Sequence, residues 1–564
     1  MTLGKSPTSE DAFRSGSDFC RDRVLATSIY GLLYRESHRL FPDEAFADLF
    51  ADIGRASVPP RIVAVVMVLQ RLEGLSDREA VDRITFDLRW KYAAGGLDFD
   101  YAGFVHTVLV DMRARLRRSA RPNRIFETAL EVAREAGLIG RKRVLDSTAL
   151  YDAVATQDTV TLIRSAIRAL LRIVDDQLGV ELRSCCRRDD AYVAPGKPSC
   201  DWDDAQAREA LVDALARDAY AILALLDGRT LGAEVQEAAK LVATVVGQDL
   251  EQRDDGCFRI ARRVAKDRVI STVDPEARHG HKTAARGFDG YKGHIAIDPD
   301  SEIITATTVT AGNVADGRVA DALVSDVLGT ALAGGSPVDA PSSSDEPCSA
   351  AAPLAPGPPE TAASSHEPHA TDAAPPVEIY GDASYGTAQF VEAIEQAGAE
   401  ANVKVQPPVA PEGKFAKDAF DVDLVNHTVR CPAGALVVIR RSTSTGEEGL
   451  RIANFGVQCT SCALRSRCTD GKEGRTIRVH PREATLQRAR HRQGAPTWKA
   501  HYRATRPKVE RKLGHLMHKR HGGRRARVRG CVRVTHDFAL LSAAHNLRRM
   551  ATLGVHYAGS TWRR

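Results

Sequence analysis

The chain has 564 residues, of which 43% are hydrophobic and 27% are charged, and its formal net charge at pH 7 is only +5. These are the values of ordinary globular sequence, and a chain of this length is expected to form several domains. No apolar run approaches the roughly 20 residues that a membrane span needs, and the first residues, MTLGKSPTSEDAFRSGSDF, lack the apolar stretch of a secretory signal. Together these features argue against a membrane protein and predict a cytoplasmic one.

A helical N-terminal domain is predicted over residues 1–135. Within it, residues 59–92 carry apolar side chains at helical spacing before Gly74, which favours two packed helices joined by a turn. Ser76 and Glu79 form a capping-box pattern, in which each side chain bonds a free backbone N–H at the start of the second helix. Such a pair of helices is either a packing unit or a helix-turn-helix that contacts DNA ends, and the residues alone leave both interpretations open.

The first predicted strand of the next domain lies in RKRVLDSTAL, residues 141–150, and ends on Asp146. A carboxylate at a strand end is a good metal ligand, although most such aspartates only cap the following turn. From about residue 155 to residue 255 the Ala-rich and Leu-rich pattern is helical, which predicts a helical insertion.

Strand-like sequence returns at YKGHIAID and SEIITATTVT, where β-branched residues dominate, and a helix is predicted to start near Asp316. Residues 333–376 are rich in Pro, Ala and Ser and cannot bury enough apolar surface to offset ordering entropy, so a disordered linker is predicted there. After it comes VEIYGDASYGT, a strand whose end carries Asp382, and then a helix and a further strand in ANVKV. Residues 136–410 are therefore predicted to form an α/β domain with a mixed sheet flanked by helices.

Residues 411–495 contain four of the eleven cysteines of the chain. An odd total in a reducing compartment argues against a disulfide framework and favours metal binding. Cys459 and Cys462 form a CxxC pattern, Cys468 follows closely, and Cys431 opens CPAG, whose Pro and Gly suit a tight ligand turn. Four thiolates would form a closed tetrahedral Zn²⁺ site, and the alternative is isolated thiols with a fortuitous CxxC. We predict a small Cys-rich domain with one structural zinc ion.

The C-terminal part, residues 496–564, is predicted to complete the α/β domain with a helix over about residues 498–520 that carries Glu510. Pro507 is expected in the first turn of this helix or at a kink. This part is strongly basic, which suits a polyanionic partner such as DNA, although a solubilising surface has the same composition. The residues predicted to contact DNA are Arg503, Arg506, Lys508, Arg511 and Lys512.

Asp146, Asp382 and Glu510 are the residue types that a two-metal phosphodiester site needs, because Mg²⁺ and Mn²⁺ prefer hard oxygen ligands on rigid elements. In such a site two ions activate the nucleophile, stabilise the leaving oxygen and offset the charge of the transition state. Arg506 lies four residues before Glu510, so it would either hold a DNA phosphate near the metals or form a surface ion pair. Three rival carboxylates are ranked lower, as loop, turn and helix-cap residues: Asp274, Asp289 and Asp316.

An ordered series of motifs runs over most of the chain: GLSDREAVDRITFDLRWKYAAG, VLDST, PSCDWDDAQAREALVDALARDA, VDPEARHGHKTAARGFDGYKGHIAID, VTAGNVADG, YGDASYG, CPAG with the later CxxC, and RPKVE. In this series the chain resembles the DDE-type transposases of bacterial insertion sequences, in the branch with an N-terminal helical domain. The resemblance implies a ribonuclease-H-like fold for the catalytic domain and places the catalytic acids of the family on Asp146, Asp382 and Glu510.

The resemblance also implies a function. The expected activity is metal-dependent cleavage and strand transfer of double-stranded DNA, at the terminal inverted repeats of the protein's own element and at target DNA, with two Mg²⁺ or Mn²⁺ ions per active site. The enzyme is expected to act as a homo-oligomer that brings two DNA ends together. Two alternatives stay open: a decayed copy that only binds DNA, and a ribonuclease-H-like nuclease that hydrolyses DNA without joining it.

Overall fold

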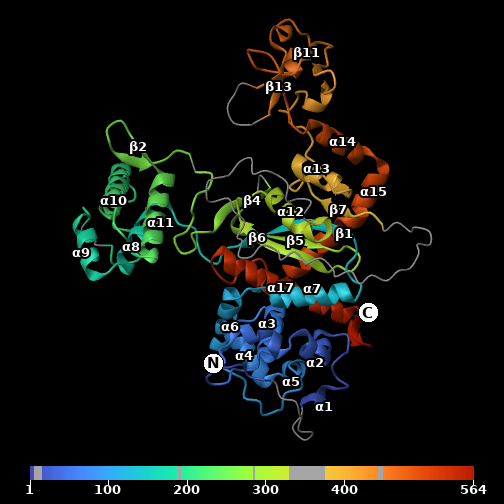
Figure 1. Ribbon diagram of the computed structural model, residues 1–564. Coiled ribbons are helices and arrows are strands. Elements are labelled where there is room, and N and C mark those ends of the chain that lie inside the picture. The colour runs from blue at the N-terminus through green and yellow to red at the C-terminus, as the bar shows by residue number, and fades with distance from the viewer. Residues whose placement is uncertain (6–15, 189–191, 264, 284–285, 330–374, 443–448) are drawn as a thin grey trace.

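The computed structural model describes residues 1–5, 16–188, 192–263, 265–283, 286–329, 375–442 and 449–564. The linker predicted over residues 333–376 lies outside the described residues except at its last two positions. Within the described ranges, no helix combines the length and the apolar composition that crossing a membrane requires. Figure 1 shows a central sheet with the N-terminal helices below it, a helical insertion to its left and a small β-rich domain above it.

The N-terminal domain consists of short helices packed around an apolar core. Its helices are α1 (Gly16–Cys20), α2 (Ile29–Leu40), the 3-10 helix η1 (Asp43–Leu49), α3 (Pro60–Glu73), α4 (Asp77–Phe86), α5 (Leu88–Ala93), α6 (Thr107–Arg118) and α7 (Arg124–Glu135). α3 ends at Gly74, which has a left-handed φ of 69°, and the capping box of Ser76 and Glu79 begins α4 as predicted. The segment predicted as two helices contains a third, because the Asp87 side chain accepts a hydrogen bond from the Arg89 N–H and starts α5.

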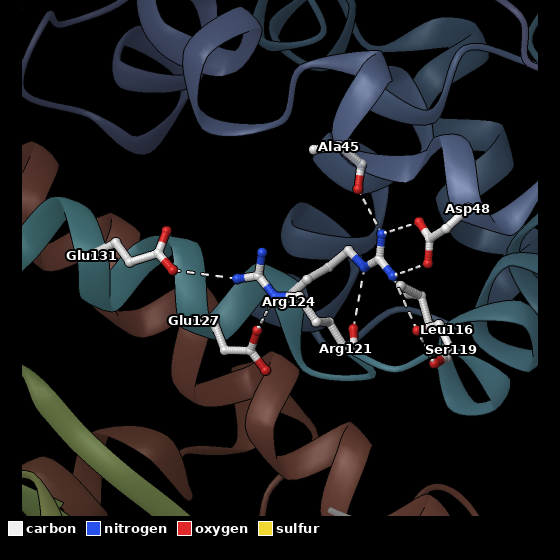
Figure 2. A network of polar contacts seen from close by, with 8 residues as sticks. All are labelled: Ala45, Asp48, Leu116, Ser119, Arg121, Arg124, Glu127 and Glu131. Atoms are coloured by element: carbon white, nitrogen blue, oxygen red, sulfur yellow. Dashed lines mark hydrogen bonds and ion pairs between the residues drawn. The ribbon is translucent and has the colours of Figure 1, made fainter. Parts of the chain in front are cut away.

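A network of polar contacts fastens the start of α7 to η1 (Figure 2). The buried Arg124 guanidinium donates to both Asp48 carboxylate oxygens, at 2.6 and 2.7 Å, and to a backbone carbonyl of η1 at 2.6 Å. Arg121 pairs with Glu127 and Glu131 on α7 itself. A bidentate arginine–carboxylate pair fixes both distance and orientation, so α7 and η1 are held in one arrangement.

The central sheet combines antiparallel and parallel strands in the order β4-β5-β1-β7-β8, with β6 also paired to β5. Its strands are β1 (Lys142–Tyr151), β4 (Arg278–Thr283), β5 (Arg286–Ile297), β6 (Ile304–Ala311), β7 (Glu378–Gly381) and β8 (Glu400–Val403). β5 is antiparallel to β1, whereas β7 is parallel to β1 and β8 is parallel to β7. The structure therefore has the mixed sheet that the sequence predicts.

Helices cover both faces of this sheet. On one face, Val144 of β1 belongs to a core that continues through α17 (Cys531–Thr552) into the N-terminal domain. On the other face, Leu145 packs with α12 (Ala320–Leu328) and α13 (Ala388–Gln396). Because neighbouring strand residues point to opposite faces, every second residue of β1 points toward α17. Figure 1 shows α17 between the sheet and the N-terminal helices, so this helix joins the two domains.

The helical insertion follows β1 and has a core of its own. It consists of α8 (Thr159–Ile173), α9 (Asp176–Ser184), α10 (Ala205–Leu226) and α11 (Ala233–Asp249), with a hairpin of β2 (Leu250–Gln252) and β3 (Phe258–Ile260). Leu162, Leu215 and Val245 are among the side chains buried between these helices. The insertion therefore forms a separate packing unit that projects from the sheet (Figure 1).

The Cys-rich segment is a small β domain between β8 and α14 (Glu483–Gly494). Its strands form two three-stranded sheets: β9 (Asp421–Asp423), β10 (Thr428–Arg430), β11 (Leu436–Val438), β12 (Arg440–Arg441), β13 (Arg451–Asn454) and β14 (Thr476–Val479). The chain then returns to the sheet through α15 (Pro496–Thr505) and α16 (Pro507–Leu516), and after α17 it ends in the hairpin of β15 (His556–Ala558) and β16 (Thr561–Arg563). The helical stretch predicted over residues 498–520 is divided into α15 and α16, because Pro507 lacks the N–H that would continue α15; Pro507 occupies the first turn of α16, as predicted.

Candidate active site

Asp146 and Asp382 are brought together by the pairing of β1 with β7. Val144 lies opposite Tyr380 in this parallel pair, and each aspartate follows two residues later. Because parallel strands advance equally per residue, the two carboxylates reach the same edge of the sheet. Asp382 directly follows β7 as predicted, but Asp146 lies inside β1 and not at its end, since β5 continues to pair with β1 as far as Tyr151. The pairing of β1 with β7 ends at Val144, so no residue of β7 pairs with Asp146.

Arg506 occupies the centre of the acidic cluster, by which we mean Asp146, Asp382 and Glu510. Its guanidinium nitrogens lie 2.9 Å from an Asp146 oxygen, 3.7 Å from an Asp382 oxygen and 3.4 Å from a Glu510 oxygen. Glu510 lies in the first turn of α16, four residues after Arg506, so the two side chains share a helix face. The structure thus brings together three acids that are far apart in the sequence.

Burial affects the two aspartates of the cluster. It raises the pKa of Asp146 against the opposing effect of the Arg506 cation. It also raises the pKa of Asp382, where Arg506 again opposes the rise and the neighbouring Asp146 charge adds to it. Asp146 is 8% exposed and the Glu510 side chain is 62% exposed, so the cluster opens to solvent at Glu510. With one arginine facing three carboxylates, the cluster holds an excess of negative charge that suits a cationic ligand.

A fourth carboxylate, Asp316, lies beside the cluster and was ranked low by the sequence analysis. It begins the 3-10 helix η2 (Asp316–Val319) and is buried. Its oxygens accept hydrogen bonds from the Ser147 hydroxyl at 2.6 Å and from the Lys292 ammonium at 3.0 Å. Burial opposes its ionisation, but a neighbouring histidine, Lys292 and Ser147 together lower the pKa of Asp316. Because Ser147 points to the opposite face of β1 from Asp146, Asp316 supports the strand from behind.

The other two rival carboxylates have partners elsewhere. Asp274 is buried and accepts hydrogen bonds from the Tyr291 hydroxyl at 2.7 Å and from the Gly530 N–H at 3.2 Å. Asp289 pairs with His279 across the β4–β5 hairpin at 2.7 Å. Both acids therefore have local structural partners, and no ion pair joins either of them to the central arginine within the described chain.

Two buried contacts that the sequence analysis did not single out lie beside the acidic cluster. His294 shares hydrogen bonds with the Tyr385 hydroxyl, at 3.0 Å, and with a threonine of β6, at 2.9 Å. Burial lowers the pKa of His294 to about 4, so the imidazole is neutral at pH 7. On the other side, the Tyr502 hydroxyl of α15 donates to the Gly381 carbonyl at 3.1 Å, which ties α15 to the residue just before Asp382.

The basic residues predicted to contact DNA lie in different surroundings. Arg503 is exposed and has no carboxylate partner among the described residues. Lys508 and Arg511 pair with carboxylates of the turn between β5 and β6. Arg506 faces the acidic cluster, and Lys512 is 4% exposed, where burial lowers the pKa of its ammonium group to about 8. Fewer of these basic side chains are exposed than the sequence predicts, because Lys512 is buried.

The donor set of the acidic cluster fits a divalent cation, because all three groups are hard carboxylates on two strand positions and one helix. Within the described chain, no three Asp, Glu, His or Cys side chains are spaced to hold one ion. In the cluster, the Arg506 guanidinium forms ion pairs with all three acids. A cation bound by all three acids would take the place that this guanidinium fills.

The four cysteines of the Cys-rich domain line one cavity of about 30 Å³. Burial raises the pKa of the Cys468 thiol; the Arg475 cation opposes this rise, and the charges of Cys459, Cys431 and Cys462 add to it. Their spacing is not that of a ready ligand set in the part of the chain that is described. The zinc site stays a prediction.

Comparison with known families matches three segments of the chain. A transposase domain family (DUF772) matches residues 27–115, and two families described as transposase DDE domain match residues 257–334 and 430–551. No curated protein and no solved structure gives a significant match. The last segment contains Glu510, whereas neither Asp146 nor Asp382 falls inside a matched segment.

A mixed sheet that gathers acids at one edge, together with these matches, defines an enzyme of the nuclease or transposase class. The chain belongs to the DDE-type transposases of insertion sequences. Membership in this family implies binding of DNA at the ends of an insertion sequence and use of a divalent metal, typically Mg²⁺.

Proposed function

We propose that the protein catalyses metal-dependent cleavage and strand transfer of double-stranded DNA at the terminal inverted repeats of its own insertion sequence. In this proposal the α/β domain is ribonuclease-H-like, and Asp146, Asp382 and Glu510 hold Mg²⁺ or Mn²⁺. The observation that carries it is the convergence of these three acids around Arg506 at one edge of the mixed sheet. The two matches to transposase DDE domains, over residues 257–334 and 430–551, support it.

Divalent ions bound at the cluster would supply Lewis-acid activation of the nucleophile and charge neutralisation at the leaving oxygen. The residues of the chain do the positioning. β1 and β7 hold Asp146 and Asp382 at a common edge, and α16 presents the exposed Glu510 carboxylate from the side. Arg506 has the planar fork that binds phosphate oxygens, and it lies where a scissile phosphate would meet the acids. Asp316 acts through Ser147 and Lys292 as a positioning residue for β1.

The test is a reaction of the purified protein with Mg²⁺ and a labelled duplex that carries the ends of its parent element. Mapping the new 3′-hydroxyl groups and the joined products measures cleavage and strand transfer separately. Asp146→Asn should abolish both while the affinity for the duplex stays unchanged. Asp289→Asn is the matched control, because it makes the same change in the neighbouring β5 strand, where the carboxylate pairs with His279. Equal activity of both variants would remove Asp146 from the site.

The two alternatives give different products in the same experiment. A protein that only binds DNA would shift the duplex without nicking it at any Mg²⁺ concentration. A nuclease without joining activity would release 3′-hydroxyl ends but no strand-transfer product when target DNA is present. Homo-oligomerisation belongs to the proposal as well, because two element ends must be held together for strand transfer, and light scattering of the protein on end duplexes measures it.

A structural zinc ion in the Cys-rich domain is a second, separate proposal. Its support is that Cys431, Cys459, Cys462 and Cys468 line one cavity, and thiolates are the ligands of closed zinc sites. Elemental analysis of the full-length protein should find about one zinc per chain. Cys459→Ser with Cys462→Ser should lose it, whereas Cys257→Ser, an exposed thiol in the helical insertion, should keep it. Absence of zinc from the wild-type protein after metal-supplemented growth would end this proposal.

A further inference from the structure

A cavity of about 290 Å³ lies between the N-terminal domain and α17. Its walls come from α3, α4, α6, the start of α7 and the first half of α17. Figure 1 shows α17 across the tops of α3 and α6, so the cavity lies at the junction that joins the N-terminal domain to the sheet. Its volume is close to the lower limit of ligand sites, about 300 Å³.

The charged side chains of this cavity are mainly arginines. We call this group the arginine cavity: Arg71, Arg113, Arg117, Arg527 and Arg533, with the two carboxylates Asp77 and Asp537. The Arg113–Asp77 pair has a nitrogen–oxygen distance of 2.5 Å, and the Arg71–Asp537 pair has one of 3.1 Å. These two pairs use both carboxylates.

Three of the arginines have no carboxylate of their own within the described chain. Arg527 donates to the Leu75 backbone carbonyl, and Arg117 and Arg533 lie on α6 and α17 on the two sides of the cavity. Burial lowers the pKa of Arg117, and Arg533 and Arg113 lower it further through charge. Five guanidinium groups against two carboxylates leave an excess of positive charge, which costs free energy in the protein alone.

His536 adds a polar group that is poorly satisfied. Its Nδ1 shares a hydrogen bond with the Asn123 side chain at 2.9 Å, while its Nε2 is buried without a hydrogen-bond partner in the described structure. Burial and the Arg117 charge lower the pKa of His536. Buried polar atoms normally have partners, so this imidazole indicates a place where a ligand or water completes the site.

We propose that the arginine cavity binds a phosphate group of the DNA backbone. An oxyanion would neutralise the excess charge and offer acceptors to the planar guanidinium forks of Arg117 and Arg533, which suit phosphate oxygens. Apolar side chains such as Leu116 and Val528 provide contact for a sugar. Because α17 joins both domains, a phosphate bound here would hold the N-terminal domain and the sheet in one register on the duplex. This inference rests on the proposed function only for the source of the phosphate.

The first experiment needs no DNA and no catalysis. Inorganic phosphate, compared with chloride at equal ionic strength, should raise the melting temperature of the wild-type protein by about 2 °C, because a ligand that binds only the folded state stabilises it. The variant Arg117→Ala with Arg533→Ala should lose this rise. The control Arg118→Ala with Arg529→Ala removes the same charge from exposed positions of the neighbouring segments and should keep it. An equal rise in all three proteins would mean diffuse surface binding and would overturn the proposal.

The second experiment assigns the source of the phosphate. Fluorescence anisotropy with a duplex carrying the element ends should show about tenfold weaker binding for the cavity variant than for the control variant, since charged hydrogen bonds to phosphate are lost. The dependence of binding on salt should fall by about one unit in its logarithmic slope. Loss of the phosphate effect with unchanged DNA affinity would overturn the assignment to DNA and leave a free phosphate or nucleotide as the ligand.

Misfolding is excluded by the same melting curves. The cavity variant removes like charges without breaking an ion pair, so its melting temperature in chloride should equal or exceed that of the wild type. If the double variant melts several degrees lower, the single variant Arg533→Ala, at an exposed position, replaces it in the phosphate melting experiment and in the DNA-binding experiment. Because neither readout depends on strand cleavage, failure of the proposed activity and failure of this inference are separable.

Discussion

The acidic cluster around Arg506 and the arginine cavity beside α17 are charged sites of opposite sign. In the cluster, one guanidinium faces three carboxylates; in the cavity, five guanidinium groups face two carboxylates. Both form where segments from distant parts of the chain meet. Clustering like charges costs free energy unless a ligand of opposite charge neutralises them. The cluster therefore suits metal cations, and the cavity suits phosphate.

Arg124 shows a compensated arginine in the same N-terminal domain (Figure 2). Its guanidinium binds both oxygens of Asp48, and the remaining donors meet backbone carbonyls and a serine hydroxyl. No ligand is needed to complete this network. The number of arginines in a region is therefore a poor indicator of anion binding. The number of arginines that lack a carboxylate partner is a better one.

The largest effect is expected in the acidic cluster. Asp382→Asn or Glu510→Gln keeps the side-chain size but removes a charged metal ligand, which should slow strand cleavage by about 10³-fold or more. Duplex binding should not change, because the basic contacts remain. Single-turnover cleavage with Mg²⁺ and anisotropy with the same duplex measure the two quantities. Wild-type cleavage by Glu510→Gln would remove Glu510 from the metal site.

The next largest effect concerns the arginines of the cavity that pair with a carboxylate. Asp537→Asn leaves the buried Arg71 without its carboxylate, and breaking a buried pair costs about 3 kcal/mol of stability. Thermal melting measures the loss, and Asp111→Asn, an exposed carboxylate of α6, is the matched control. Added phosphate should restore part of the melting temperature of Asp537→Asn. If the melting temperature of Asp537→Asn falls and phosphate does not raise it, the Arg71–Asp537 pair does not contribute to the proposed anion site.

A smaller effect is expected on the exposed basic surface beside the cluster. Arg503→Glu should weaken binding to every duplex alike, several-fold at low salt, and reduce the logarithmic salt dependence by about one unit. Arg172→Glu makes the same charge reversal on α8 of the helical insertion and serves as control. Binding to cognate and unrelated duplexes over a salt series distinguishes the outcomes. Loss of affinity for the cognate duplex alone would mean that this surface reads bases.

The smallest effect is a pH dependence of the stability that the Arg124–Asp48 network provides. The Arg124 hydrogen bonds hold the pKa of Asp48 below its ordinary value of 3.8. A carboxyl group with a lowered pKa stabilises the folded protein above that ordinary value, and this stabilisation is lost as the pH falls through the lowered pKa. The melting temperature of wild type should therefore exceed that of Asp48→Asn at pH 6, and the difference should shrink as the pH falls below 3.8 through the lowered pKa. Glu44→Gln, an exposed change in the same η1 helix, should show no such trend. The half-exposed Asp48 side chain keeps the effect small.

Features that depend on a few neighbouring residues were predicted well from the sequence. The capping box of Ser76 and Glu79, the turn at Gly74 and the strand that ends before Asp382 are all present. The length of β1 was not predicted, because the pairing partner that extends it past Asp146 is β5, far along the chain. α17 was also missed, since it is buried on most sides and lacks the one-sided apolar pattern of a surface helix.

By itself, the sequence determined the family, the mixed sheet and the choice of Asp146, Asp382 and Glu510 as candidate acids, because motif order and residue type are properties of the linear chain. Only the tertiary structure decided that Arg506 lies between those acids, that Lys512 is buried, and that five arginines gather beside α17. The physical reason is that charge compensation depends on which side chains meet across the fold. The sequence alone does not distinguish a basic residue that has a carboxylate partner from one that is buried or one that is available to bind phosphate.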